Sequence, residues 1–234
     1  MKGFSFFIGL FLSTLFIAVQ ASADAGEFDS LIKKVPSAAD VVNKPTLFRS
    51  VELDGLPVTK RQFEFLLDHP RLSTFLARMS DPQLDAYKVE VHPDGSSHVN
   101  DLRGLAGDME LVSESDGRRI YYIKGHWDFP LGIRFNGRMV LVACYGEVGG
   151  RVDSRTLGYM RVDNALVGLV AKLVAYIFPG KVDARIARFS GAVRKVAVAV
   201  HDDPEGVYKR LATSGEVPAG DLEAYRSSFC VRRG

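Results

Sequence analysis

Apolar and polar residues alternate through the middle of this chain, and short glycine-containing turns separate the alternating runs. Asp54-Gly55, Asp94-Gly95 and Asp116-Gly117 are three of these turns. Alternation with a period of two predicts strands that each have one buried face. Because such turns contain no crossover helices, the sheet should be antiparallel. The predicted strands are Thr46 to Leu53, Leu84 to Val91, Ser97 to Ser113, Arg118 to Phe129, Ile133 to Val148 and Arg155 to Val162.

Two segments show helical spacing instead. Thr59 to Met79 predicts two short helices that meet at Asp68-His69-Pro70. Lys181 to Val200 is amphipathic, with charged residues around one apolar stripe, which predicts a long surface helix across the sheet. The stripe consists of Val182, Ile186, Phe189, Val193, Val196 or Ala197, and Val200.

The segment just before this long helix, Asn164 to Phe178, is apolar on almost every side, and Pro179-Gly180 follows it. A helix without a polar face must be covered by protein or by lipid. It has about fifteen residues, fewer than the roughly twenty that cross a bilayer. We therefore interpret it as a buried or interfacial helix, which can be core, a lid, or a peripheral membrane contact.

The N-terminus has the pattern of a secretory signal peptide. Lys2 precedes an apolar run from Phe4 to Val19, and Ala21-Ser22-Ala23 has the small residues that signal peptidase cleaves. An uncleaved membrane anchor is the alternative. The sequence thus predicts a periplasmic or secreted protein. Its parts are a signal peptide (1–23), an N-terminal lead-in (24–45), one domain (46–211) and a C-terminal tail (212–234).

Charge and cysteine content narrow the possible partners. The chain has 30 basic and 28 acidic residues, and loss of Lys2 with the signal peptide lowers its net charge of +2 by one. Without a net basic field we expect no nucleic-acid partner. Cys144 and Cys230 leave two alternatives open. They pair in an oxidising compartment, closing a loop of roughly 86 residues worth on the order of 4 kcal/mol, or Cys144 is buried and Cys230 near the C-terminus is free.

The order of the predicted elements resembles a known family. A strand, two short helices, an antiparallel meander and a long C-terminal helix are similar to the helix-grip fold of the START and polyketide cyclase-like (SRPBCC) superfamily, here as a secreted bacterial member. The most suggestive segments are Phe65 to Pro70 and Asn136 to Val142. The resemblance covers about Thr46 to Leu211, and it implies an α+β fold in which a curved antiparallel sheet wraps around the helix.

The resemblance further implies a cavity between the sheet and the helix for a lipid, a sterol-like molecule or another apolar small molecule, with no cofactor. Binding pockets of this kind are mostly apolar with a few polar groups, although the same side chains can equally fill an ordinary core. The candidate ligand-binding residues are Tyr87, Met109, Tyr121, Trp127, Phe135, Met139, Tyr145, Tyr159, Phe189 and Val193.

Candidate catalytic and metal-binding residues are few. No GxSxG, HExxH, CxxC or P-loop motif occurs. His126 and Asp128 should share one face of a strand and could act in acid-base chemistry, but Trp127 then faces the other side. His92 and His98, with Asp94 and Asp101 nearby, could bind a metal ion or be solvated turn residues.

Three functional hypotheses follow. The leading one is an extracytoplasmic protein that binds or transfers an apolar ligand without altering it. The second is a cyclase, dehydratase or hydrolase that uses His126 or an acidic residue on an apolar substrate. The third is a noncatalytic envelope module in which the Asn164 to Phe178 surface binds a partner or a membrane.

Overall fold

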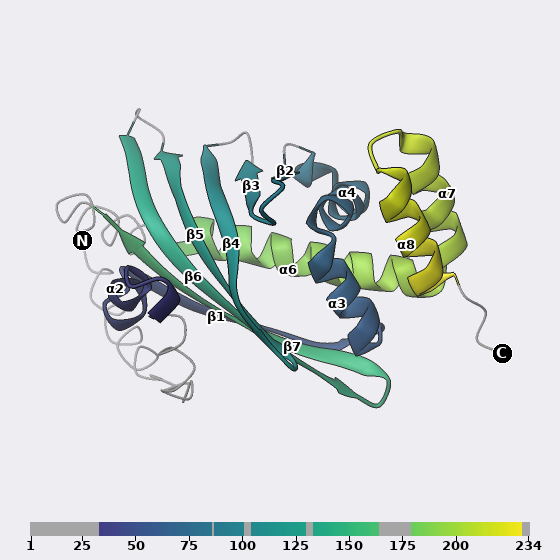
Figure 1. The fold of residues 1–234 in the computed structure, drawn as a ribbon, viewed down its shortest axis with the longest axis horizontal. Helices are drawn as coiled ribbons and strands as arrows, with labels where there is room; N and C mark the ends of the chain where they lie inside the picture. Colours follow the sequence, from purple (N-terminus) through teal and green to yellow (C-terminus); the bar gives the residue numbers. More distant parts are fainter. Residues whose placement is uncertain (1–32, 86, 101–103, 130–132, 164–178, 231–234) are drawn as a thin grey trace, which may run out of the picture.

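In a computed structural model, the described residues are 33–85, 87–100, 104–129, 133–163 and 179–230. They contain one seven-stranded sheet with the order β1-β7-β6-β5-β4-β3-β2, in which every neighbouring pair is antiparallel (Figure 1). Its strands are β1 (Leu47–Leu56), β2 (Lys88–Val91), β3 (Ser97–Asn100), β4 (Leu105–Ser115), β5 (Arg118–Phe129), β6 (Ile133–Val148) and β7 (Arg151–Val162).

The two faces of the sheet have different cover. Because side chains alternate along a strand, Tyr145 and Val152 face one side, and Val142 and Leu157 face the other. Tyr145 packs in the same cluster as Val196 of the long helix α6 (Pro179–Asp202), which crosses the sheet on that side (Figure 1). We call this the inner face and the opposite one the outer face.

A row of glycines crosses the inner face. Gly107 of β4, Gly125 of β5 and Gly137 of β6 are direct partners in the register. A Cβ atom on Gly125 would meet the carbonyl oxygen of Ala106 and lie 2.8 Å from the Gly107 Cα. Such close approach of strand backbones is typical of a glycine kink, which curves a sheet. The row thus bends the sheet around the space next to α6.

The segment predicted as one glycine-interrupted strand, Ser97 to Ser113, is two strands. Gly104 precedes β4 with φ +106, a conformation that side chains other than glycine rarely adopt, and a Cβ there would lie 2.7 Å from the Asp128 carbonyl oxygen. β3 pairs with β4 only over Ala106 to Met109. The remainder of β4 therefore has β5 as its strand partner on one side and no strand of the described residues on the other.

The outer face is covered by α2 (Ala38–Asn43), part of the segment predicted as a lead-in. Ala38 and Val41 are fully buried against a cluster on the outer face. Ser37, just before the helix, is hydrogen-bonded through its hydroxyl to that of Tyr122 at 2.7 Å. The described residues of the lead-in, 33–45, are consequently part of the folded domain. The outer-face cluster consists of Val112, Ile120, Tyr122, Val140, Val142 and Leu157.

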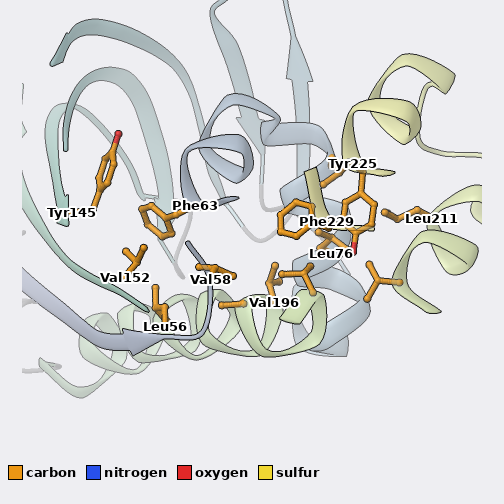
Figure 2. Packing of buried hydrophobic residues seen from close by; sticks show 14 residues of the cluster. Leu56, Val58, Phe63, Leu76, Tyr145, Val152, Val196, Leu211, Tyr225 and Phe229 are labelled. Carbon is orange, nitrogen blue, oxygen red and sulfur yellow. The ribbon is translucent and has the colours of Figure 1, made fainter. Parts of the chain in front are cut away.

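The main core lies where α6 meets α3 (Lys60–Asp68) and α4 (Pro70–Ser80). Thr59 caps α3 with Gln62 in a capping box, and Pro70 occupies the first turn of α4, so the two helices begin where the sequence predicts. A short 3-10 turn, η1 (Pro82–Leu84), follows them. Figure 2 shows Leu56, Val58, Phe63, Leu76, Tyr145, Val152 and Val196 gathered in this core.

The C-terminal residues, predicted as a tail, belong to the same core. α7 (Pro204–Ser214) and α8 (Ala219–Phe229) lie at the end of α6, and Leu211 and Tyr225 are fully buried (Figures 1 and 2). Phe229 packs edge-on against Phe65 of α3, with ring centroids 5.4 Å apart. Residues 212–230 thus extend the domain rather than trailing from it.

The α+β prediction is confirmed, since a long helix lies across a curved antiparallel sheet. The predicted signal peptide and the segment Asn164 to Phe178, with its proposed membrane contact, lie outside the described residues. Within the described part, no helix combines the length and the apolar character needed to cross a membrane.

Candidate functional site

The apolar stripe of α6 changes its exposure along the helix. Val196 and Val200 are 5% and 2% exposed, whereas Phe189 and Val193, on the same side of the helix, are 39% and 40% exposed. At 3.6 residues per turn these four side chains point in one direction, toward the inner face. The core therefore closes over the C-terminal half of the stripe and leaves Phe189 and Val193 accessible.

The inner face of the sheet has a matching apolar surface. Met109, Ile123, Met139 and Met160 form one row of register partners across β4, β5, β6 and β7. A second row beside it contains Leu111, Tyr121 and Leu141. All of these side chains are partly accessible, and Leu111 is 40% exposed. We call the two rows, together with Phe189 and Val193, the inner apolar surface.

Tyr87 forms a wall at one side of this surface. It is 7% exposed, and its ring meets that of Phe189 edge-on with centroids 4.8 Å apart. Leu84 and Ala192 complete this small cluster, which holds α6 against the start of β2. Tyr87 thereby fixes the position of Phe189 at the edge of the inner apolar surface.

A buried charged group borders the second row. Arg119 lies two residues before Tyr121 on β5 and hence on the same face, and only 4% of its side chain is exposed. Its guanidinium is paired with Asp68 at the end of α3 (2.7 Å) and with Glu114 of β4 (2.8 Å). Two carboxylates around one cation give this group, the Arg119 cluster, a net negative charge.

Two tyrosine hydroxyls lie within hydrogen-bonding reach of the Arg119 guanidinium. These belong to Tyr121 and Tyr145, and the Tyr145 hydroxyl also reaches Glu64. Burial raises the pKa of both phenols, and the positive charge of Arg119 opposes this shift. Both hydroxyls therefore stay protonated at neutral pH.

The structure separates the ten predicted ligand residues into groups. Tyr145 packs in the main core against Phe63, with centroids 5.2 Å apart. Phe135, 7% exposed, lies on the inner face beyond the glycine row. The side chain of Trp127 lies outside the described part. Five of the ten belong to the inner apolar surface, and Tyr87 borders it. The five are Met109, Tyr121, Met139, Phe189 and Val193.

Tyr159 lies on the opposite face from the other candidates, which corrects its prediction as an inward residue. It is the register partner of Val140, packs against the outer-face cluster, and its ring lies 4.9 Å from that of Phe48. The prediction placed the wrong face of β7 inward. The position of Tyr159 excludes contact with a ligand on the inner apolar surface.

Sequence reasoning missed Arg119, Asp68 and Glu114. The signal was available for Arg119, because alternation along β5 places it on the same face as Tyr121. Its partners come from α3 and β4, and no spacing rule joins residues on different elements.

The predicted histidine chemistry lies away from the inner face. His126 and Asp128 do share a face, with Nε2 and Oδ2 3.9 Å apart, but it is the outer face, where Arg134 also binds Asp128 at 2.6 Å. His98 pairs with Asp108 at 2.6 Å on the same outer face. Among the described residues no group of three or more His, Cys, Asp or Glu side chains could hold a metal ion. Asp101, named in the metal hypothesis, lies outside them.

Two of the open hollows in the described part of the molecule are lined by none of the residues of the inner apolar surface. One of about 330 Å³ lies at the edge of the sheet and is lined by charged residues such as Glu52, Asp153 and Arg155, together with Cys144. The other, of about 180 Å³, lies between α4 and β2 and is lined by Arg71, Arg78 and Lys88 among others. The lining of the second hollow is mainly polar, unlike that of sites for apolar molecules.

The two cysteines are free. Cys144 packs against the outer-face cluster, whereas Cys230 packs with the main core, where its thiol lies 3.6 Å from the Pro204 carbonyl oxygen. Burial raises the pKa of the Cys230 thiol. Of the two alternatives, the structure therefore has the unpaired one.

Comparisons with known proteins give distant likenesses. No family model and no curated protein matches the chain. It is similar in structure to a putative uncharacterized protein from Rhizobium leguminosarum (12% identity, TM-score 0.42), covering 65% of this chain and 92% of that one. It is also similar to Ara h 8.0201 (10%, 0.43, covering 65% and 99%) and to norcoclaurine synthase from Thalictrum flavum (12%, 0.41, covering 65% and 85%). Likenesses this distant carry no argument about function.

Proposed function

We propose that this protein binds an apolar small molecule, such as a lipid or a sterol-like compound, between the sheet and α6. The observation that carries the proposal is the exposure of Phe189 and Val193 on the stripe that is buried at Val200. Keeping apolar side chains in water costs free energy, and clustered exposure of this kind marks binding surfaces.

The geometry favours a small molecule over a flat protein partner. The accessible side chains come from two opposed surfaces, one on α6 and one on the sheet rows that contain Met109 and Leu111. Ligand sites are concave and mostly apolar, with few polar groups. Methionines add adaptability, because their unbranched side chains fit ligands of different shape.

The proposal does not include catalysis. The hypothesis of a cyclase, dehydratase or hydrolase used His126 or an acidic residue. His126 lies on the outer face, and the carboxylates of Asp68 and Glu114 are ion-paired with Arg119. In the proposed site the ligand meets hydroxyl and ion-paired groups at one edge and is bound without covalent change.

Binding is tested by titrating the mature protein with N-phenyl-1-naphthylamine, whose fluorescence rises when it leaves water. Val193→Asp should weaken binding roughly tenfold or more, because a carboxylate would face the apolar probe. Val198→Asp is the matched control, since Val198 is also 40% exposed on α6 but points about 140° away from Val193. Leu111→Asp repeats the test from the sheet.

The proposal fails if the wild-type protein binds neither this probe nor sterols, fatty acids or phospholipids. It also fails if Val193→Asp, Leu111→Asp and Val198→Asp bind the probe equally well. Circular dichroism of each variant distinguishes lost binding from lost folding.

The proposed place of action is outside the cytoplasm. Its support is the N-terminal sequence, in which Lys2, an apolar run and Ala21-Ser22-Ala23 have the order of a signal peptide. N-terminal sequencing of the protein recovered outside the cytoplasm should begin at Asp24. An intact N-terminus on a cytoplasmic protein would refute this part of the proposal.

A further inference from the structure

Two donors of the Arg119 cluster have no partner among the described residues: the buried Nε of Arg119 and the hydroxyl hydrogen of Tyr121. The guanidinium has donors and no acceptor, so where it bonds to Tyr121 the phenol oxygen must accept. The phenol hydrogen then needs an acceptor of its own, and within the described residues Tyr121 has no bond to one. Tyr145 differs, because its hydroxyl reaches Glu64 as well as Arg119.

Tyr121 is positioned to present this hydrogen to a ligand. It lies in the second row of the inner apolar surface, between its register partners Leu111 and Leu141. The ion pairs of Arg119 with Asp68 and Glu114 hold the guanidinium in place, and the guanidinium in turn orients the phenol. The inner apolar surface thus has one polar group in a fixed position, the Tyr121 hydroxyl, next to its apolar side chains.

We propose that the ligand is a neutral amphiphile whose polar end, a hydroxyl or carbonyl oxygen, accepts a hydrogen bond from the Tyr121 hydroxyl. This inference rests on the proposed function and names the class of molecule bound. Arg119 acts as a positioning residue in this site. Tyr121 is the residue that donates the hydrogen bond to the oxygen of the ligand.

The charge of the cluster excludes the most obvious alternative, a free fatty acid. An arginine ordinarily attracts carboxylates, but Arg119 is already paired with two of them. A third carboxylate would meet a group that is already net negative, and the one guanidinium donor without a partner, Arg119 Nε, is buried. Like charges at short range repel. An uncharged oxygen accepts the same hydrogen bond without this cost.

The test is competition for bound N-phenyl-1-naphthylamine by three ligands with the same chain: 1-dodecanol, dodecanoate and dodecylammonium, at about pH 7.5, where the carboxylate and the ammonium are both charged. Dodecanol should displace the probe at the lowest concentration, because an ammonium has no lone pair to accept the Tyr121 hydrogen and a carboxylate is repelled by the cluster. Tyr121→Phe, which keeps the ring, should raise the dodecanol concentration needed by about fivefold, the effect of one hydrogen bond. Tyr122→Phe is the matched control, because the adjacent Tyr122 is buried on the outer face.

The outcomes separate this inference from the proposed function. If wild-type protein binds the probe but dodecanoate or dodecylammonium displaces it best, the inference is overturned while ligand binding stands. Equal dodecanol competition in wild type and Tyr121→Phe overturns it in the same way. If wild type binds no probe at all, the proposed function itself has failed.

Discussion

Asp68 is the last residue of α3, and its carboxylate lies 2.7 Å from the guanidinium of Arg119 on β5. A negative charge at the C-terminal end of a helix is unfavourable, because it adds to the negative end of the helix dipole. Arg119 offsets this charge and joins α3 to the sheet. This ion pair, in which only the guanidinium is buried, therefore positions the helix that covers one end of the inner face.

Arg119→Gln should destabilise the fold. It leaves Asp68 and Glu114 without their cation, but both carboxylates are about half exposed and can be hydrated. We expect a loss of about 2 kcal/mol, below the range for fully buried pairs. Urea unfolding measures it, and adding Asp68→Asn should recover part of the loss.

Arg134→Gln is the control, because Arg134 makes an equally short pair with Asp128 on the exposed outer face. Solvent screens that pair, so the unfolding midpoint should hardly move. Equal effects of the two substitutions would contradict the importance of burial at Arg119.

The curvature of the sheet depends on the glycine row, which gives a second prediction. Gly125→Ala places a Cβ against the backbone of β4, at the Ala106 carbonyl oxygen and the Gly107 Cα. Backbone atoms inside a sheet cannot move aside as a side chain can, so we expect a loss of about 1–3 kcal/mol. Thermal unfolding followed by circular dichroism measures it.

Gly146→Ala is the matched control, since Gly146 also lies in a strand of the sheet, but a Cβ added there would meet nothing within 4 Å. The stability of this variant should stay within about 0.5 kcal/mol of wild type. If both alanines are tolerated equally, the glycine row is not what bends the sheet.

The sequence predicted the strands and the central helices well because local patterns determine them. Asp116-Gly117 ends one strand and begins the next, and Gly117 has the positive φ (69) that its turn requires. The helical spacing that begins at Thr59 predicted the start of α3 in the same local way. Such signals depend only on neighbouring residues.

Features that depend on contacts between distant segments were harder to predict. Alternation along β7 does not say which face points inward, and Tyr159 was placed on the wrong one. The pairing of Tyr159 with Val140, set by the hairpin between β6 and β7, decides it. Arg119 likewise acquires its role only when α3 and β4 bring Asp68 and Glu114 to it.

Helix α8 supplies a third prediction, because its residues were expected to form a tail. Tyr225 is fully buried and stacks on Phe229 with ring centroids 4.7 Å apart. Tyr225→Ala should cost about 3–5 kcal/mol, the range for removing a large aromatic side chain from a core. Glu223→Ala on the exposed side of α8 is the control and should leave the urea midpoint unchanged. If residues 219–229 were a loose tail, neither substitution would change the urea midpoint, and that result would contradict the prediction.

The hydroxyl of Tyr225 gives a prediction for alkaline pH. Burial raises its pKa far above the ordinary value, because the phenolate would lie in the core. In the unfolded chain the same phenol has a pKa of about 10. Above that pH the unfolded state loses a proton that the folded state keeps, so the free energy of unfolding falls as pH rises.

The size of this effect follows from proton linkage. One tyrosine of this kind removes about 1.4 kcal/mol of stability for each pH unit above about 10, and nothing below it. Tyr225→Phe keeps the ring and abolishes the ionisation, so urea unfolding between about pH 8.5 and 11 should show a shallower decline than in wild type. The two proteins should differ by a constant amount below about pH 9. Parallel curves over the whole range would mean that the phenol of Tyr225 ionises as readily in the folded protein as in the unfolded chain.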